Sequence, residues 1–548
     1  MRHLSSIKDD PAPKSLHIKA TGRFYTPEAI GRPLAKELAG LIASTDAPLV
    51  VVDPFCGDGR LVAWFMEEAA RRDIRTSRLL VRLWDIDPAA VAEAQKRVRA
   101  VASALNVHAD VEAFVGDSFA KGSTARDDAD VLITNPPWER LKPDRREHDG
   151  LRPDASERYV AELRAYDRQL SEWFPLSRPV KKFSGWGTNL SRVGTEMSLR
   201  LIKMGGVAGV VSPPSLLGDQ DSLPLRRHLL TEYRLEALSY FPAEARLFEG
   251  VDQPAITFVA VRQCPPSDGW VRTTVFDADG RRGRTGGFAL HPSRLEQSGY
   301  YLPTGFGVEA ADLIVRFEEN PTFASLESPG PHGLWAGREI DETSYESFLR
   351  PTGNNLFVKG RMIERWAVRE IPSQYVDPSL RRIPPSTAHP RVAWRDVSRP
   401  NQKRRVQASL IPAGWVAGNS LSVAHFRDDS LPRLSGLLAL LNSLVFEFQV
   451  RARLSTGHVS LGTVRQVGVP ESLFERSGVE LAALATRRLA GDTEAEHLIE
   501  VRIAQLYGLD LADFERLVRC FPKITPEESG SLLESWRRVT HLDLSKAG

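Results

Sequence analysis

Four short apolar segments in the first quarter of the chain each end in a polar side chain, and this recurrence limits the fold more than any other feature. The segments are LVVVD, LLVRLWD, VEAFVGD and VLITN, which end at Asp53, Asp85, Asp117 and Asn135. The first two are each followed by a turn and by a stretch with apolar residues at helical spacing. Strands that alternate with helices in this way predict a doubly wound α/β fold with a mostly parallel sheet.

The four polar residues are expected to lie together. The carboxyl ends of neighbouring parallel strands meet at one edge of a sheet, and open α/β folds bind their ligands there. Each residue also has a simpler explanation by itself, because an acid after a strand often caps the next helix and Asn-Pro-Pro is often only a rigid turn. Their common placement at strand ends favours a binding site.

Length and composition limit the rest of the chain. With 548 residues, 42% hydrophobic and 26% charged, the chain is too long for one core and predicts two or three domains. The 72 Lys and Arg residues nearly balance the 70 Asp and Glu residues, so the net charge of +2 indicates no partner. The three cysteines have no CxxC spacing, which predicts a reducing compartment and no metal site. The sequence has no signal-peptide pattern and no apolar run of membrane-spanning length, which predicts a cytoplasmic protein without a membrane partner.

The fourth segment continues as VLITNPPWERL, in which two adjacent prolines remove two backbone donors and stiffen the chain. The order GRFYTPEAIGRPLAKEL, DPFCGDGR, WDIDP, GDSF and NPPW resembles the S-adenosylmethionine-dependent N6-adenine DNA methyltransferases of the gamma arrangement. This resemblance covers about residues 20 to 265. From about residue 350 the chain resembles, more loosely, the target recognition domains of type II restriction-modification methyltransferases. The resemblance implies a Rossmann-like class I methyltransferase domain followed by an α+β target recognition domain.

The resemblance also implies S-adenosylmethionine as the cofactor. Close backbone approach to this ligand would come from the two glycines of DPFCGDGR, and the acid after the first strand would face its cationic end. The acid after the second strand would accept the ribose hydroxyls, and the acid after the third would accept the adenine amine. The predicted cofactor-binding residues are Tyr25, Thr26, Pro27, Asp53, Pro54, Gly57, Gly59, Asp85, Ile86, Asp117 and Phe119.

The predicted catalytic residues are Asn135, Pro136, Pro137 and Trp138. The lone pair of an adenine exocyclic amine is delocalised into the ring, so the amine is a poor nucleophile. Two acceptors, the Asn135 side-chain oxygen and the Pro136 carbonyl, would draw its nitrogen toward a tetrahedral geometry. Trp138 would stack on a base extruded from the duplex, and Phe248 would clamp that base from the other side. Transfer would then be direct, gaining its rate from orientation and fixed dipoles.

The remaining sequence predicts the division of the chain. We expect a flexible tail at 1–20, the methyltransferase domain at 21–270, a connector rich in turn residues at 271–345, the DNA target recognition domain at 346–475 and a helical segment at 476–548. Residues 155–174 have helical spacing, but no function is assigned to them. The densest positive patch is HPRVAWRDVSRPNQKRR, residues 389 to 405, which is predicted to bind DNA phosphates. Its cations are Arg391, Arg395, Arg399, Lys403, Arg404 and Arg405.

The sequence therefore favours a site-specific adenine-N6 DNA methyltransferase of a restriction-modification system. Its partners would be double-stranded DNA and a separate restriction endonuclease, and no oligomeric state is predicted. Two alternatives stay open: a methyltransferase that acts on RNA or on protein glutamine, since Asn-Pro-Pro-aromatic suits any planar amine or amide, and a catalytically silent DNA-specificity subunit. The target sequence and the choice between adenine N6 and cytosine N4 are not fixed by these motifs.

Overall fold

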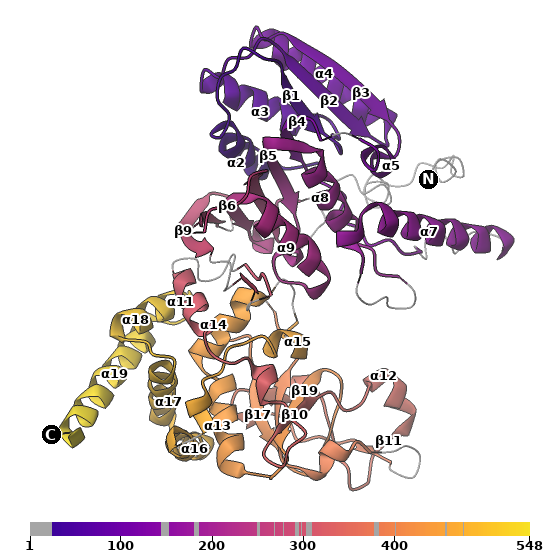
Figure 1. Ribbon diagram of the computed structural model, residues 1–548. Coiled ribbons are helices and arrows are strands. Elements are labelled where there is room, and N and C mark those ends of the chain that lie inside the picture. The colour runs from indigo at the N-terminus through magenta and orange to yellow at the C-terminus, as the bar shows by residue number, and fades with distance from the viewer. Residues whose placement is uncertain are drawn as a thin grey trace. The chain divides into compact units, whose positions relative to one another are not determined.

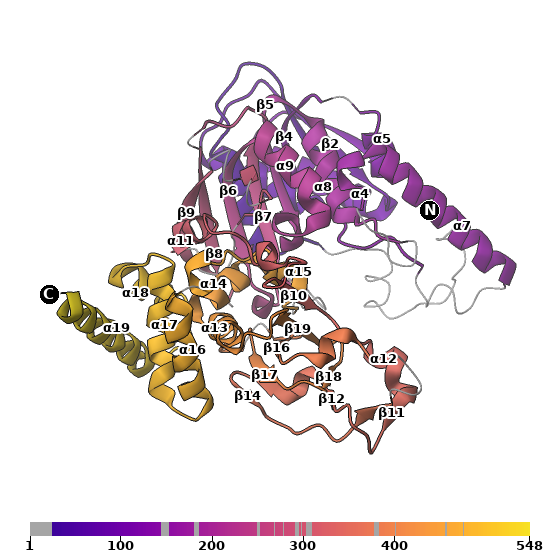
Figure 2. The ribbon, with the colours of Figure 1, turned by 60° about the horizontal axis from the view of Figure 1, so that its bottom comes forward.

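The computed structural model describes residues 25–547, except 126, 144–152, 180–185, 249–252, 268, 278, 291–294, 297–298, 303–309, 378–382, 400–401, 455–457 and 475. The predicted tail at 1–20 lies outside these described residues. The chain divides into two compact units, Met1–Val308 and Glu309–Gly548. Figures 1 and 2 show the two units.

The first unit is built on a nine-stranded sheet in the order β3-β2-β1-β4-β5-β7-β6-β8-β9. Strands β1 to β5 run parallel, β7 is antiparallel to both of its neighbours, β8 is parallel to β6, and β9 is antiparallel to β8. The strands are β1 Leu49–Asp53, β2 Leu79–Asp85, β3 Ala109–Val115, β4 Ala129–Thr134, β5 Ile202–Ser212, β6 Arg234–Phe241, β7 Ala255–Val261, β8 Gly269–Phe276 and β9 Arg282–Leu290. This topology confirms the predicted α/β fold with a mostly parallel sheet.

Helices cover both faces of this sheet. Helices α2 Glu28–Ala39, α3 Arg60–Arg71 and α4 Pro88–Ala104 pack side by side, and their apolar residues join the main hydrophobic core with those of β1, β2 and β4. Helices α5 Ser118–Gly122, α8 Leu190–Leu201 and α9 Leu223–Glu232 form a second packed group, in which α8 contacts β4 and β5 and α9 contacts β6. The long helix α7, Pro153–Trp173, confirms the helical spacing predicted for residues 155–174.

The second unit combines a small antiparallel sheet with helices. Its four strands have the order β10-β19-β16-β17, with β10 Leu334–Gly337, β16 Arg391–Arg395, β17 Ala408–Ile411 and β19 Leu421–Phe426. Helices α13 Leu431–Leu441 and α14 Leu444–Arg453 follow, and α16 Arg476–Leu489, α17 Thr493–Leu506, α18 Leu511–Arg519 and α19 Pro526–Ala547 end the chain. The unit is thus of the α+β type.

The boundary between the units differs from the predicted one. The segment 271–345 was predicted to be a connector because it is rich in turn residues, but its first part forms most of β8 and all of β9 of the large sheet. Glycines and arginines of this segment belong to a hairpin, which pairs with β6 through β8. The division falls at residues 308 and 309 rather than at 270 and 271.

Among the described residues, no single helix is long and apolar enough to cross a membrane. The pair α13 and α14 reaches that length and hydropathy only together, across a bend of 58°. Most of its residues are buried within the second unit, as expected of core helices.

Candidate active site

The loop after β1 brings its backbone close to the end of the neighbouring strand. Gly57 and Gly59 have positive φ angles of 50° and 78°, which side chains other than glycine rarely adopt. A Cβ at Gly59 would lie 2.8 Å from Ala94 Cα, so this glycine also lets α3 start against α4. The Gly57 amide donates to Asp85 Oδ2 at 2.9 Å, and the Cys56 amide donates to the Trp84 carbonyl at 2.9 Å. The loop is therefore fixed to the carboxyl end of β2.

Asp53 is a fully buried carboxylate, and only one of its two oxygens is hydrogen-bonded within the described residues. Its Oδ1 accepts from the Thr134 hydroxyl at 2.7 Å and from the Phe55 amide at 3.1 Å. Its Oδ2 is buried and has no hydrogen-bond partner among the described residues. Burial raises the pKa of Asp53 to about 7, against the opposing effect of the Thr134 and Phe55 bonds. Such a group favours a donor or a cation brought by a ligand.

Asp85 is the last residue of β2, the strand next to β1, and Asp117 lies two residues after the end of β3, the strand beyond it. Asp85 Oδ1 accepts from the Asp87 amide at 3.0 Å, and burial raises the pKa of Asp85. Asp117 Oδ1 accepts from the Phe119 and Ala120 amides at 2.9 and 3.3 Å, as the cap of α5. Since β3, β2 and β1 are adjacent, the three acids lie along one sheet edge, as the sequence predicted.

The other predicted cofactor residues lie around these acids. Tyr25 is 42% exposed; a Cβ at Gly57 would lie 3.2 Å from its ring, and the Arg60 guanidinium lies 5.1 Å from the ring centroid. Arg60 also donates to the Thr26 carbonyl, which ties the start of α2 to the loop after β1. Of the remaining predicted residues, Pro27 caps α2, Ile86 is 49% exposed, and Thr26, Pro54 and Phe119 are buried.

The NPPW stretch is held from three sides. It follows β4, which pairs with β1 and β5. Beyond it, the Glu139 carbonyl accepts from the Leu190 amide and the Leu141 amide donates to the Thr188 carbonyl, both at 2.9 Å. Helix α8 packs closely against it, because a Cβ at Gly194 would lie 2.4 Å from Pro136 Cβ. No role is predicted for Gly194 from the sequence, although a glycine inside an otherwise regular helix is the signal that indicates such a close approach.

The two residues predicted to clamp a target base lie against each other. The rings of Trp138 and Phe248 are 5.1 Å apart with an interplanar angle of 61°. Phe248 is 5% exposed and Trp138 is half-buried, with its indole Nε1 buried and without an acceptor among the described residues. A base can enter between these rings only after they separate.

Helix α7 reaches the same edge of the sheet. The Tyr166 hydroxyl lies next to the Asp117 carboxylate, and burial, followed by this contact, raises the pKa of Tyr166. Just after α7, Phe174 packs edge-on against Phe119 at 6.3 Å, and Phe119 in turn lies 5.1 Å from Phe55. No function was assigned to this helix from the sequence, yet it contributes to the surroundings of the predicted adenine pocket.

The predicted DNA-binding patch of residues 389–405 is largely a structural element. Its residues Arg391–Arg395 form β16, an inner strand of the small sheet, whose side chains are covered on both faces. Arg391 is fully buried, donates to Glu339 at 2.6 Å, and also donates to the carbonyls of Pro412 and Trp415. Trp394 is fully buried as well.

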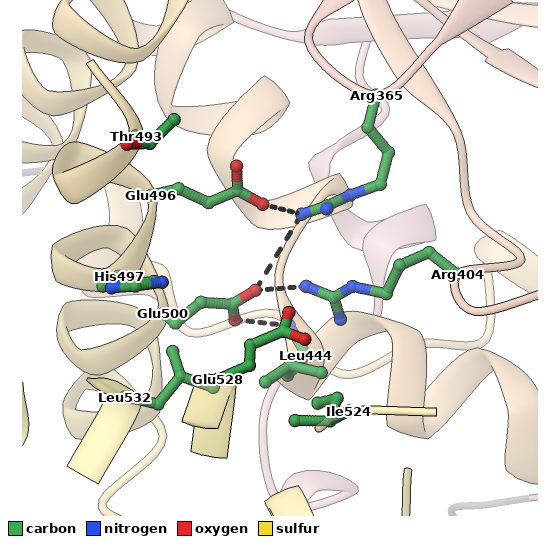
Figure 3. Close-up of a pocket in the computed structure, with 10 residues that line it drawn as sticks. All are labelled: Arg365, Arg404, Leu444, Thr493, Glu496, His497, Glu500, Ile524, Glu528 and Leu532. Carbon is green, nitrogen blue, oxygen red and sulfur yellow. Dashed lines mark hydrogen bonds and ion pairs between the residues drawn. The ribbon is translucent and has the colours of Figure 1, made fainter. Parts of the chain in front are cut away.

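Two more of the predicted cations are also buried. Arg405 donates to the Ser398 hydroxyl at 3.0 Å. Arg404 forms an ion pair with Glu500 of α17, beside the pair that Arg365 forms with Glu496, in a cavity of about 130 Å³ (Figure 3).

The prediction that the six cations form a phosphate-binding surface is therefore wrong for Arg391, Arg404 and Arg405. Arg391 and Arg404 pair with glutamates inside the protein, and the buried Arg405 side chain donates to Ser398. Among the others, Arg395 is half-buried, Lys403 pairs with Glu528, and Arg399 is exposed. Local charge density misled the prediction because it does not show that β16 is covered on both faces, or that glutamates distant in sequence pair with Arg391 and Arg404.

One group of possible metal ligands occurs among the described residues. His389, His425 and Asp429 bring ligand atoms within 4.8 Å of one another. The two imidazole rings stack at 4.0 Å with only 9° between their planes, and Asp429 contacts His389 Nδ1 at 2.8 Å. Because nitrogen lone pairs lie in the ring planes, one ion would lie outside the plane of at least one ring. We therefore assign no metal to this group.

Comparison with known proteins addresses the motifs directly. Residues 14–161 match the family model for N-6 DNA methylase. The match runs from before Tyr25 to beyond Trp138, and so it confirms the resemblance predicted from the motifs. A comparison with curated protein sequences finds no match.

Several solved structures are similar at low sequence identity. A class I S-adenosylmethionine-dependent methyltransferase from Listeria monocytogenes is 15% identical, with a TM-score of 0.32 over 45% of this chain and 65% of that chain. The type IIG restriction endonuclease BpuSI is 14% identical, with a TM-score of 0.42 over 94% of this chain and 68% of that one. The type IIL restriction-modification enzyme MmeI, solved in complex with DNA, is 11% identical, with a TM-score of 0.47 over 93% and 75%. This chain spans less than two thirds of the length of the Listeria protein.

Proposed function

We propose that the first unit binds S-adenosylmethionine at the carboxyl edge of its sheet and transfers the methyl group to N6 of an adenine in double-stranded DNA. The protein would act as the modification enzyme of a restriction-modification system, with a separate endonuclease as its companion. The observation that carries this proposal is the position of NPPW, rigidly held at the same edge as Asp53, Asp85 and Asp117. The match of residues 14–161 to the N-6 DNA methylase family supports it.

The residues at this edge fit the cofactor. S-adenosylmethionine supplies an electrophilic methyl group on a positively charged sulfur. The buried Asp53 Oδ2, which lacks a partner among the described residues, suits a cationic ligand, and a cation would lower the pKa of Asp53 from about 7. Asp85 would accept the ribose hydroxyls with the lone pairs not used by the Gly57 and Asp87 amides. Asp117, which Tyr166 contacts, would bind the adenine amine.

The catalytic residues would activate the target amine by hydrogen bonding. The side-chain oxygen of Asn135 and the carbonyl of Pro136 would each accept one hydrogen of N6, which draws the nitrogen lone pair out of conjugation. The nitrogen would form its bond to the methyl carbon as the bond from that carbon to sulfur breaks, and the amine would then lose one proton to water. Gly194 and the two prolines would keep the acceptors in place, since orientation supplies much of the rate.

Trp138 and Phe248 would hold the extruded base. Their edge-to-face contact would open, and the base would replace one ring as the stacking partner of the other. Trp138 Nε1, buried without an acceptor among the described residues, would gain one from the base or its sugar.

Methyl transfer to DNA tests this function. Purified protein would be incubated with labelled S-adenosylmethionine and unmethylated genomic DNA, and the modified base would be identified by mass spectrometry. We expect N6-methyladenine at one recurring sequence. The variant Asn135→Ala should lose at least a hundredfold in rate while it still binds the cofactor. The control Lys96→Ala, at an exposed position of α4, should keep the wild-type rate. Transfer only to RNA or protein, or equal rates for Asn135→Ala and the control, would contradict the proposal.

A further inference from the structure

The turn between β8 and β9 lies at the same edge of the sheet as the candidate active site. Strand β6 is parallel to β5 because both are antiparallel to β7, and β8 is parallel to β6. The end of β8 therefore points in the same direction as the end of β4, where NPPW follows. The rings of Phe241 and Phe276, at the ends of β6 and β8, stack at 4.2 Å with an interplanar angle of 22°. Figure 2 shows β6, β8 and β9 side by side in the sheet.

This turn is anchored beside the residues that would clamp a target base. A Cβ at Gly280 would lie 3.1 Å from Leu247 Cδ2 and 3.5 Å from the Cβ of Ala29, near the start of α2. Leu247 directly precedes Phe248, whose ring contacts Trp138. Asp277 Oδ1 fixes the turn by accepting from the Asp279 and Arg281 amides at 3.0 and 2.8 Å.

The surface around this turn carries exposed arginines. Arg281 and Arg282 are exposed on the turn and at the start of β9, and Arg246 is exposed immediately before Leu247. In the part of the chain that the structure describes, none of these three forms an ion pair. The two acids of the turn, Asp277 and Asp279, offset part of the charge, but Asp277 is directed at backbone amides. By comparison, Arg391 and Arg404 are buried and form ion pairs with glutamates.

We infer that Arg246, Arg281 and Arg282 bind the phosphates next to the extruded nucleotide. The inference rests on the proposed function, because it takes DNA as the substrate of the neighbouring site. An extruded base stays attached to its two phosphates, so these charges come to the rim of the pocket that holds the base. Arginine suits this role, since its planar guanidinium can donate two hydrogen bonds to one phosphate. These residues supply the cationic surface that residues 389–405 were predicted to supply.

The salt dependence of DNA binding tests this inference. The double variant Arg281→Gln/Arg282→Gln removes two exposed charges from the turn. The matched control is Lys96→Gln/Arg99→Gln, which removes two exposed charges from α4 of the same unit. Affinity for a duplex would be measured by fluorescence anisotropy over a range of salt concentrations. The logarithm of the association constant falls linearly with the logarithm of the salt concentration, and each phosphate contact contributes roughly 0.9 to the magnitude of this slope. We therefore expect the turn variant to reduce the magnitude of the slope by about 2. Adding Arg246→Gln should lower it by about one more.

The outcomes separate this inference from the proposed function. Both variants should bind S-adenosylmethionine like the wild type, and the control should keep the wild-type slope. If the wild type methylates DNA but the turn variant and the control have the same slope, the inference is wrong and the proposed function stands. If the wild type neither binds nor methylates DNA, the proposed function fails and the inference fails with it.

Discussion

The carboxyl edge of the large sheet and the basic segment 389–405 both looked functional in the sequence, and the structure separates them. At the sheet edge, residues from four strands and a helix lie together around Asp53, Asp85, Asp117 and NPPW. In the basic segment, the residues are adjacent in the chain, but Arg391, Arg404 and Arg405 are buried inside the second unit. Polar residues at the ends of successive parallel strands carry information about position. A run of charges gives no information about position unless the strand that contains it is recognised.

The largest effect should come from breaking the buried pair in the basic segment. Arg391→Ala would leave Glu339 buried without its cation, and we expect a loss of about 3–5 kcal/mol in the free energy of unfolding. Arg399→Ala, at an exposed position of the same segment, should change it by less than about 0.5 kcal/mol. Urea denaturation measures both variants. If Arg391→Ala is as stable as the wild type but no longer binds DNA, the prediction that this segment binds DNA phosphates would be supported instead.

A smaller effect should appear in the pH dependence of stability at the sheet edge. The pKa of Asp53 is raised from 3.8 to about 7 in the folded protein. The stability that this group contributes is fully present below pH 3.8 and is lost as the pH rises to about 7. Between these values the stability of the wild type should fall, relative to Asp53→Asn, by roughly 1 kcal/mol per pH unit.

Only this slope is compared, so a constant cost of the substitution cancels. Denaturation of both proteins between pH 4 and 8 gives the result. Equal slopes would mean that folding does not raise the pKa of Asp53, and that its carboxyl group is already ionised at neutral pH in the free protein.

The smallest effect should come from Gly194, which connects stability with catalysis at the same edge. A methyl group at this position would collide with Pro136, so Gly194→Ala should cost about 1–3 kcal/mol of stability and reduce kcat by moving the acceptors. Gly530, in α19, has no atom within 4 Å of an added Cβ, so Gly530→Ala should be neutral or slightly stabilising. Thermal unfolding and methyl transfer rates measure the pair. A normal kcat for Gly194→Ala would show that α8 does not position NPPW.

The sequence predicted the first unit well because its signals are local and repeated. Strand-like segments followed by polar residues, a glycine loop and a helix after it define the order β1 to β4 and the polar residues at or just after the ends of these strands. What it could not predict depends on contacts distant in sequence. The addition of β8 to β6, the contact of Gly194 with Pro136 and that of Tyr166 with Asp117 join segments whose separate patterns do not refer to each other.

The second unit was harder to predict for a related reason. Its small sheet uses short strands, and the inner strand β16 contains two arginines that resemble a surface pattern. The partner that makes Arg391 an interior residue, Glu339, is far away in the sequence. Only the alternation of Val392 and Trp394 pointed to a buried strand, and the positive charge obscured it.

Calorimetric titration with S-adenosylmethionine tests the central claim most directly, namely that the sheet edge of the first unit is the ligand site. We predict one bound ligand per chain, an affinity reduced at least tenfold by Asp85→Ala, and an unchanged affinity for Arg399→Ala. Circular dichroism would first establish that both variants are folded. If folded wild-type protein does not bind S-adenosylmethionine, or if Asp85→Ala binds it as tightly as the wild type, the claim is contradicted.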